Sequence, residues 1–217
     1  MKDSYLTLAN PSTGFFRDRG SKFLAFAWPI RSEIEVHEHL DSLRKLHPKS
    51  RHFCYSYRLG LDENNFRAND DGEPSGTAGK PILGQIDSFG LTNVFVVVVR
   101  YFGGTLLGTS GLINAYRNAT QDALQQGDIV EKLVEDVYRL TFGYDRMSDV
   151  MTAVKKLEIS VLKQSFEEIA ILEIAVRQSN KEQVFTMLKA YIAKVTADEA
   201  ALIEDIPGLD IQFLFVT

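Results

Sequence analysis

The sequence predicts an α+β protein built from two domains, each with a two-layer α/β architecture. A chain of 217 residues with 45% hydrophobic residues can supply cores for two domains of roughly 80 to 130 residues each. Apolar residues recur at strand-like and helix-like intervals along the whole chain. Beyond Gly127 the predicted elements follow the order βαββαβ, so we place the domains at residues 1–130 and 136–217.

The first domain opens with a predicted hairpin of residues 15–19 and 22–30, whose second strand alternates its apolar side chains between two faces. A helix follows, because Ser32 and Glu35 have the spacing of a capping box and apolar residues then recur at helical intervals. We expect this helix to stop at Pro48.

Residues 51–59 return to a period of two and predict a strand with two contrasting faces. A buried polar face needs polar neighbours for its hydrogen-bonding groups, so we expect the surrounding loops to converge on it. One face carries Phe53, Tyr55, Tyr57 and Leu59, and the other carries His52, Cys54, Ser56 and Arg58.

Three further elements complete the first domain. Pro81 favours a short helix that begins near it, since proline is tolerated in the first turn of a helix. The apolar run of residues 94–99 predicts a strand that is buried on both faces, as in the middle of an α/β sheet. The pattern from Leu112 predicts a helix that ends near Gly127.

The second domain consists of four predicted strands and two predicted helices. This order fits a ferredoxin-like module with both helices on one side of an antiparallel sheet. The strands cover residues 137–144, 159–166, 168–177 and 209–216, and the helices begin at residue 147 and at a cap formed by Ser179 and Glu182. We expect the module to fold independently around a core that includes Phe142, Val154, Ile171, Leu188 and Phe213.

Charge is distributed unevenly along the chain. Residues 1–60 carry ten Lys and Arg against six acids, whereas residues 128–217 carry ten against sixteen. Any nucleic acid would therefore contact the first domain, because phosphate contacts come from clustered cations. Cys54 is the only cysteine, and no segment has about 18 uninterrupted apolar residues. We expect a cytoplasmic protein without a signal peptide or a membrane span.

Residues 69–80 read N-D-D-G-E-P-S-G-T-A-G-K and predict a shaped loop. The three glycines tolerate backbone angles that other residues reach only with strain. Asp70, Asp71 and Glu73 could hold a divalent cation or serve as acid and base, because hard cations prefer clustered carboxylates. The spacing matches no EF-hand or HExxH motif, and loop carboxylates often bond neighbouring amides instead.

A second glycine-rich segment, residues 103–111, follows the buried strand and leads into a helix. The free amides and the positive end of that helix could receive a phosphate or a carboxylate. The segment lacks the spacing of a Walker or dinucleotide-binding motif, and a plain strand-to-helix connection is the alternative. Arg100 ends the strand where α/β sheets tend to bind ligands, and Arg58 and Lys80 could join it.

His52 and Cys54 share a strand face, so a thiol and its base could act together as in a cysteine hydrolase. Neighbours on the same face are roughly 6.5 to 7 Å apart at Cα, which does not ensure a hydrogen bond. A buried cysteine more often packs as a small apolar side chain, and we favour that role for Cys54.

Three motifs in the first domain resemble the IMPACT family. They are D-D-G-E-P-S-G-T-A-G-K-P-I-L from Asp70, V-V-V-R-Y-F-G-G from Val97 and L-G-T-S-G-L from Leu107. The resemblance extends to Ser21, Lys22 and Phe23 in the hairpin and to H-x-C-Y at residues 52–55, and so covers essentially the first domain. The second domain resembles the ferredoxin-like appendage of bacterial members, which is similar to a C-terminal domain of elongation factor G.

The resemblance implies a fold and a general role. The first domain is expected to have the left-handed βαβ fold of domain IV of elongation factor G. Eukaryotic members are implicated in the control of translation under amino-acid starvation. Bacterial members look like nucleic-acid or ribosome-associated proteins, with no established reaction.

We therefore expect a translation-related regulator that binds RNA or the ribosome, with a protein of the translation machinery as a further partner and with no catalysis, cofactor or metal. One competing hypothesis is a small-ligand enzyme, of hydrolase or phosphate-ligand type, that uses the acidic loop. Another is a protein-docking module that acts through the ferredoxin-like sheet. The expected cleft residues are His52, Cys54, Arg58, Asp70, Asp71, Gly72, Glu73, Thr77, Gly79, Lys80, Arg100, Gly103, Gly104, Gly108, Thr109, Ser110 and Arg117.

Overall fold

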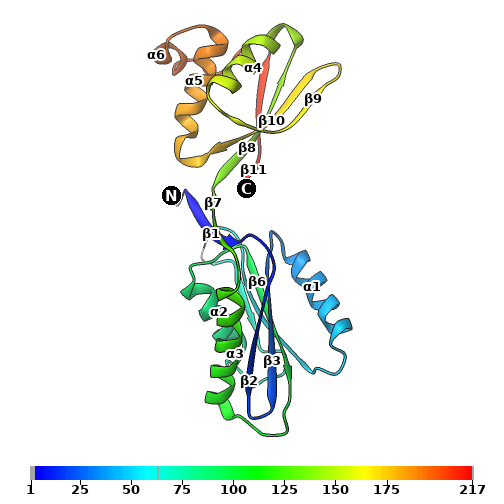
Figure 1. The fold of residues 1–217 in the computed structure, drawn as a ribbon. Helices are drawn as coiled ribbons and strands as arrows, with labels where there is room; N and C mark the ends of the chain where they lie inside the picture. The colour runs from blue at the N-terminus through cyan, green and yellow to red at the C-terminus, as the bar shows by residue number, and fades with distance from the viewer. Residues whose placement is uncertain (1–2, 63, 217) are drawn as a thin grey trace. The chain divides into compact units, whose positions relative to one another are not determined.

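The structure, a computed structural model, describes residues 3–62 and 64–216 and divides into two compact units. One unit is Tyr5–Lys132, and the other is residues 133–216 together with residues 3–4. Each unit consists of a β-sheet with helices packed on it (Figure 1). No helix in the described part of the chain is long and apolar enough to cross a membrane.

The Tyr5–Lys132 unit is built on a five-stranded antiparallel sheet in the order β2-β3-β6-β4-β5. The valine-rich β6 is the central strand and is buried on both faces, as its unbroken apolar run predicts. Because the neighbouring strands are antiparallel, their carboxyl ends do not share one edge, so the rule for ligand binding in α/β sheets does not by itself assign a site to this sheet. The strands are β2 (Ser12–Asp18), β3 (Ser21–Pro29), β4 (His52–Arg58), β5 (Phe66–Asn69) and β6 (Val94–Tyr101).

Helices cover both faces of this sheet, so the unit has three layers and the predicted two-layer architecture is wrong. The helix α1 (Glu33–Leu46) buries residues such as Leu40 against one face. The helices α2 (Gly79–Ser88) and α3 (Gly108–Gln125) pack on the opposite face, where Ile82 is fully buried. Figure 1 shows α1 on one side of the strands and α2 and α3 on the other. The physical reason is that the central strands bury both of their faces.

The ends of these helices follow local signals only in part. Glu35 accepts hydrogen bonds from the Arg31 N–H at 2.9 Å and from Ser32 Oγ at 3.0 Å. The Ser32 side chain does not cap a backbone amide, and Glu35 bonds the N–H of Arg31 and not that of Ser32, so neither bond of the predicted capping box forms. Pro81 lies in the first turn of α2, as predicted.

The apolar periodicity of the sequence does not predict three short strands. They are β5, β1 (Ser4–Leu8) and β7 (Ile129–Leu133), and the last two form a two-stranded sheet. Each has only four or five residues, and none alternates cleanly between buried and exposed side chains. A strand of this length gives too little pattern to be separated from a loop.

The second unit is a four-stranded antiparallel sheet in the order β11-β8-β10-β9. Two helices pack on one of its faces and share a single apolar core with it. A one-turn helix, α6 (Ala197–Ala200), precedes the last strand. In chain order the main elements are β8 (Glu135–Phe142), α4 (Met147–Lys156), β9 (Ser160–Phe166), β10 (Ala170–Arg177), α5 (Lys181–Ala193) and β11 (Leu209–Val216).

Two members of the predicted core of this unit are wrong. In β10 the buried apolar residues of the core are Leu172, Ile174 and Val176, so Ile171 lies on the opposite face of the sheet. Phe213 is 51% exposed because β11 is an edge strand. The other predicted members, Phe142, Val154 and Leu188, are buried in the core.

The predicted cap of α5 is also wrong. The helix begins at Lys181, and neither Ser179 nor its N-cap residue makes a side-chain cap. A complete capping box forms instead at Thr196 and Glu199, where the short α6 begins. The Ser/Thr-x-x-Glu spacing alone therefore does not identify the site at which a capping box forms.

Candidate functional site

Strand register brings predicted site residues to one end of the Tyr5–Lys132 sheet. His52, the first residue of β4, pairs with Arg100 near the end of β6, and Arg100 pairs with Phe23 near the start of β3. The loop of residues 70–78 lies at this end too, because His52 Nδ1 is 2.9 Å from the Asp71 carbonyl oxygen. This contact confirms the predicted convergence of the His52 strand with the acidic loop.

Asp70 caps the helix α2. Its carboxylate accepts hydrogen bonds from the N–H groups of Gly76 at 2.8 Å, Ala78 at 3.0 Å and Gly79 at 2.9 Å. The negative charge thus lies at the positive end of the helix, where it is stabilising. Burial alone would raise the pKa of Asp70, but the three amide hydrogen bonds, helped by nearby Lys80, lower this pKa overall.

Asp71 fixes the acidic loop to β4. Its Oδ2 accepts a hydrogen bond from the Phe53 N–H at 2.7 Å, and its own N–H donates to Asn69 Oδ1 at 2.8 Å. Asp71 and Gly72 have φ angles of 39° and 85°, so the chain turns through two successive left-handed residues. This turn carries the Asp71 carbonyl oxygen to the His52 ring.

Glu73 is the centre of a buried polar network. Its Oε1 accepts hydrogen bonds from Arg100 Nη1 at 2.6 Å and from Tyr116 Oη at 2.8 Å. The Cys54 Sγ lies 3.2 Å from Tyr116 Oη and 3.0 Å from the Asp70 carbonyl oxygen. The side chains of Arg100 and Glu73 are only 7% and 4% exposed, so the ion pair is shielded from water.

The thiol of Cys54 is held in its neutral form. Burial, as the main cause, raises the pKa of Cys54 and the pKa of Tyr116 well above their ordinary values. The nucleophile in a cysteine hydrolase is the thiolate, which these surroundings disfavour. The buried packing role that we favour for Cys54 therefore agrees with its position in the core.

Arg100 links the acidic loop to the second glycine-rich segment. Its guanidinium carbon lies 5.5 Å from the centre of the Phe23 ring and 5.6 Å from the centre of the Phe102 ring, within the range of cation–π attraction. The Phe102 side chain is 58% exposed. One aromatic ring beside a buried cation is therefore presented to solvent at this end of the sheet.

The second glycine-rich segment is shorter as a loop than the sequence predicts, because α3 already begins at Gly108. Gly108, Thr109 and Ser110 are exposed and belong to its first turn. The N-cap residue Leu107 supplies no side-chain cap, and no acidic residue lies in that turn. The backbone amides of this helix end are therefore open to an anionic group.

Glycine is favoured at positions 103 and 104 for two different physical reasons. A Cβ at Gly103 would lie 2.0 Å from the carbonyl carbon of Gly20, so this glycine permits close packing on the β2–β3 turn. The Gly103 N–H also donates to Ser21 Oγ at 3.1 Å. At Gly104 no atom lies near the position of a Cβ, but φ is 89°, which favours glycine.

Lys80 and Arg117 converge, whereas Arg58 does not join them. The first two line one shallow pocket of about 360 Å³ between α2 and α3. Arg58 pairs with Val94 at the opposite end of β4, roughly 20 Å from His52 along the strand. Its Nη2 lies 2.6 Å from an oxygen of Asp87. The placement of Arg58 in the predicted cleft is wrong, because residues at the two ends of one strand cannot share a site.

Thr77 has a structural role in the acidic loop. The residue is only 3% exposed, and its Oγ1 donates to the Pro74 carbonyl oxygen at 2.6 Å. No group of three or more His, Cys, Asp and Glu side chains within residues 3–62 and 64–216 is arranged to hold a metal ion. Each loop carboxylate is instead bound to backbone amides, or to Arg100 and Tyr116.

Sequence reasoning missed Tyr116, Phe23 and Phe102 as parts of this site. Tyr116 belongs to the apolar pattern that predicts a helix from Leu112, yet its hydroxyl joins Cys54 to Glu73. A buried tyrosine hydroxyl needs a hydrogen-bond partner, so its core position was itself a usable signal. The two phenylalanines flank Arg100 only after the strands pair, which no local pattern reveals.

The chain is similar to proteins of one known family. The family model described as the Impact N-terminal domain matches residues 19–124, which include the whole polar network. The IMPACT family member YigZ of Escherichia coli is 31% identical over 175 residues, covering 80% of this chain and 86% of its own. This chain belongs to the IMPACT family.

This chain is also similar to proteins of known structure. A crystal structure described as that of a hypothetical protein has a TM-score of 0.70 and 26% identity and covers 99% of both chains. Both units of the IMPACT chain therefore recur together in a solved fold. The structure of Yih1, described as a two-domain translational regulator, is 30% identical, covers 56% of this chain and 47% of its own, and has a TM-score of 0.34.

Proposed function

We propose that this IMPACT protein is a translation-related regulator that binds structured RNA or the ribosome through the end of the Tyr5–Lys132 sheet where β4 begins. Membership of the family supports the role in translation, because its eukaryotic members are implicated in translational control. Such a role places the protein in the cytoplasm. The observation that carries RNA binding is the exposed, uncapped N-terminus of α3.

Exposed cations on α3 and on neighbouring elements supply the charge that phosphates require. Lys80 and Arg117 line one pocket beside α3. Lys22 pairs with Tyr101 at the end of β6, and Arg51 directly precedes β4. These four exposed side chains come from separate parts of the sequence, and together they form the surface on which we expect phosphates to lie.

Exposed apolar side chains add a second kind of contact. Phe102 is 58% exposed and Leu106 is 81% exposed, and both lie in the short loop between β6 and α3. Unstacked RNA bases pack on aromatic rings with little dependence on sequence. A cationic surface with one exposed ring therefore favours a structured RNA with an unpaired base over a small anion.

The small-ligand enzyme receives less support from the same residues. A general acid or base must reach its substrate, and a metal ligand must offer a free oxygen. Both oxygens of Asp70 are bound to backbone amides, and Glu73 lies inside the protein against Arg100. Asp71 is bound to an amide through Oδ2, and its Oδ1 lies 3.9 Å from the Arg44 guanidinium. Reaction chemistry at these carboxylates would break the contacts that hold the loop.

For the fold we propose the assignments that the family implies. In the first unit, β3 and β4 run parallel and α1 joins them, while β5 and β6 run parallel and α2 joins them across the opposite face. Two such crossovers in one sheet have opposite hands, which supports a left-handed βαβ unit like that of domain IV of elongation factor G. In the second unit, the order β11-β8-β10-β9 supports a ferredoxin-like module.

Titration of structured RNA or ribosomes with the full chain at two salt concentrations tests the proposed function. We expect micromolar affinity that falls as salt rises. Lys80→Ala and Arg117→Ala should each weaken binding and lower the salt slope by about one unit, because each removes one phosphate contact.

Lys163→Ala is the matched control, because Lys163 is an exposed cation of the other unit. It should leave both the affinity and the salt slope unchanged. If the wild-type protein shows no salt-dependent affinity at micromolar concentration, the RNA proposal fails. Equal losses in Lys80→Ala and Lys163→Ala would show that overall charge, and not this surface, governs binding.

A further inference from the structure

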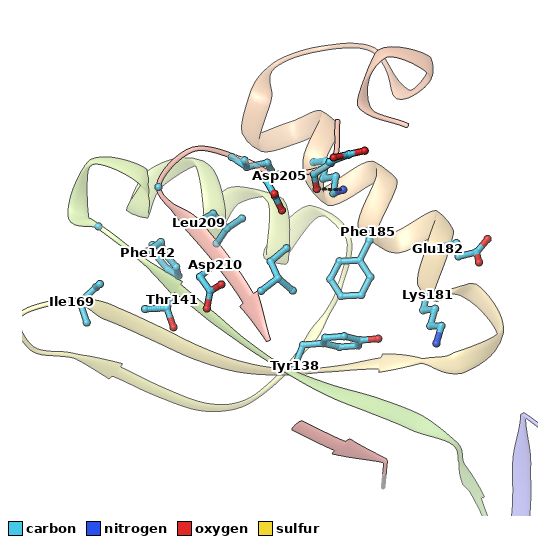
Figure 2. Close-up of a pocket in the computed structure, with 16 residues that line it drawn as sticks. Tyr138, Thr141, Phe142, Ile169, Lys181, Glu182, Phe185, Asp205, Leu209 and Asp210 are labelled. Atoms are coloured by element: carbon cyan, nitrogen blue, oxygen red, sulfur yellow. Dashed lines mark hydrogen bonds between the residues drawn. The ribbon is translucent and has the colours of Figure 1, made fainter. Parts of the chain in front are cut away.

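The second unit contains a cavity of about 880 Å³ that RNA binding does not use. Figure 2 shows it between the strands β8 and β11, the helix α5 and the segment that leads into β11. We propose that this cavity, named here the β8–α5 groove, binds a partner peptide in which apolar side chains alternate with Lys or Arg. The inference is independent of the function proposed for the first unit.

The floor of the groove is apolar. Phe142 and Leu209 are 1% and 8% exposed and close its base. Tyr138 and Phe185 stand edge to face, with ring centres 4.7 Å apart (Figure 2). Ligand pockets of roughly 300 to 1,000 Å³ are lined mainly by such side chains, so the groove has the size and lining of a binding site.

The rim of the groove is acidic and exposed. Glu182, Glu204, Asp205 and Asp210 all line it, and all four are exposed. No ion pair joins any of them to a cation within residues 3–62 and 64–216. A partner with positive charges around an apolar centre is therefore complementary to this surface.

The two lysines of the groove do not offset this charge. Lys181 Nζ lies 3.1 Å from an oxygen of Asp136, which is 2% exposed and requires a counter-charge. Lys189 Nζ donates to the carbonyl oxygens of Ile203 at 2.6 Å and Glu204 at 2.8 Å. Both ammonium groups are thus bound to groups of the protein. The contacts of Lys189 also fix the segment that forms one wall of the groove.

The position of the groove at a sheet edge favours a peptide over a small organic cation. β11 is the first strand in the order β11-β8-β10-β9 and has a strand neighbour on only one side. Leu209 and Ile211 point to the helix face, yet Asp210, which alternates to the other face, also lines the groove. An extended chain could pair with the β11 edge and place alternate side chains in the groove.

Fluorescence anisotropy with the full chain tests this proposal. The probe is a labelled nine-residue peptide that alternates Leu or Phe with Lys, and the comparison peptide carries Glu in place of each Lys. We expect the basic peptide to bind and the acidic peptide to bind at least tenfold more weakly. Similar affinities for the two peptides would overturn the proposed charge complementarity.

Variants of the rim locate the site. Asp205→Asn and Asp210→Asn keep the size of the side chains and should each weaken the basic peptide by about two- to fivefold at low salt. Glu38→Gln, an exposed acid on α1 in the other unit, is the matched control and should have no effect. Unchanged affinity in the two Asp variants would place the peptide elsewhere and overturn the proposal.

A competitor decides between a peptide and a small cation. Tryptamine offers one ammonium group and one aromatic ring, so it can satisfy only part of the groove. We expect it to displace the probe peptide only at concentrations far above the dissociation constant of the peptide. If tryptamine binds as tightly as the peptide, a small organic cation is the occupant and the proposal is wrong.

Discussion

The two glycine-rich segments of the Tyr5–Lys132 unit differ in charge and have opposite roles. The acidic segment ends at α2, whose N-terminal amides are satisfied by the carboxylate of Asp70. The second segment ends at α3, whose first turn is exposed and has no side-chain cap. The protein therefore supplies its own anion at one helix end and leaves the other available to a ligand.

This difference changes the meaning of the acidic motif. Clustered carboxylates usually suggest a metal or an acid–base pair, but here each one anchors the loop to a different element: Asp70 to α2, Asp71 to β4 and Glu73 to β6 and α3. The motif that most resembles an active site thus has a structural role, because its carboxylates anchor the loop. Ligand binding is better sought at the helix end beside it.

The largest expected effect comes from removing Glu73, the centre of the buried polar network. Glu73→Ala leaves the guanidinium of Arg100 buried without its partner, and we expect a loss of about 3 to 5 kcal/mol in the free energy of unfolding. Urea denaturation measures this loss. The double variant Glu73→Leu/Arg100→Met removes both charges and should recover part of it, whereas a loss below about 1 kcal/mol in Glu73→Ala would contradict a structural role.

The next effect concerns packing of the second segment. Gly103→Ala places a methyl group against the backbone of Gly20 and should cost about 1 to 3 kcal/mol. Thr105→Ala, at an exposed position of the same loop, should change stability by no more than about 0.5 kcal/mol. Thermal unfolding of both variants compares them, and equal stabilities would show that the β2–β3 turn can move away from the loop.

A smaller effect with a distinct pH dependence is expected at Asp70. Its pKa in the folded protein lies below the ordinary value of 3.8, so its stabilising effect is complete above about pH 4 and is lost as the pH falls through the lowered pKa. Asp70→Asn should cost about 1 kcal/mol at pH 7. Its stability should also fall less steeply than that of the wild type below pH 4.

Urea denaturation of both proteins between pH 2 and pH 7 checks this expectation. Asp41→Asn, at an exposed acid of α1, is the control and should follow the wild-type curve. Parallel acid curves for the wild type and Asp70→Asn would mean that the carboxylate does not cap α2 in solution.

The sequence predicts the parts of this site that depend on local pattern. The alternation of residues 52–58 places His52 and Cys54 on one face, and the valine run marks β6 as the central strand. The glycines and paired aspartates mark both loops. These inferences hold because strand period and turn chemistry are set by residues close in the chain.

Other parts depend on contacts between distant segments and could not be predicted. Arg58 is not among them, because the predicted strand of residues 51–59 already separates it from His52 by roughly 20 Å. The hydroxyl of Tyr116 reaches Glu73 only after α3 packs on the sheet. The three-layer arrangement likewise requires knowing that β4 buries its polar face under α2, where Ser56 Oγ donates to the Gly79 carbonyl oxygen.

The central claim is that the open end of α3 receives phosphate, and Ser110→Asp tests it most directly. An acid in the first turn should stabilise α3 by about 0.3 to 1 kcal/mol, because it lies at the positive end of the helix. The same charge would occupy the proposed phosphate site. We therefore expect stability to rise while RNA affinity falls by about five- to thirtyfold at low salt.

Ser42→Asp, at an exposed position of α1 on the opposite face of the sheet, is the matched control for added negative charge. The decisive measurement is the dissociation constant for structured RNA of the wild type, Ser110→Asp and Ser42→Asp at one low salt concentration. We expect a large loss of affinity for Ser110→Asp alone. Equal affinities of Ser110→Asp and the wild type would contradict it.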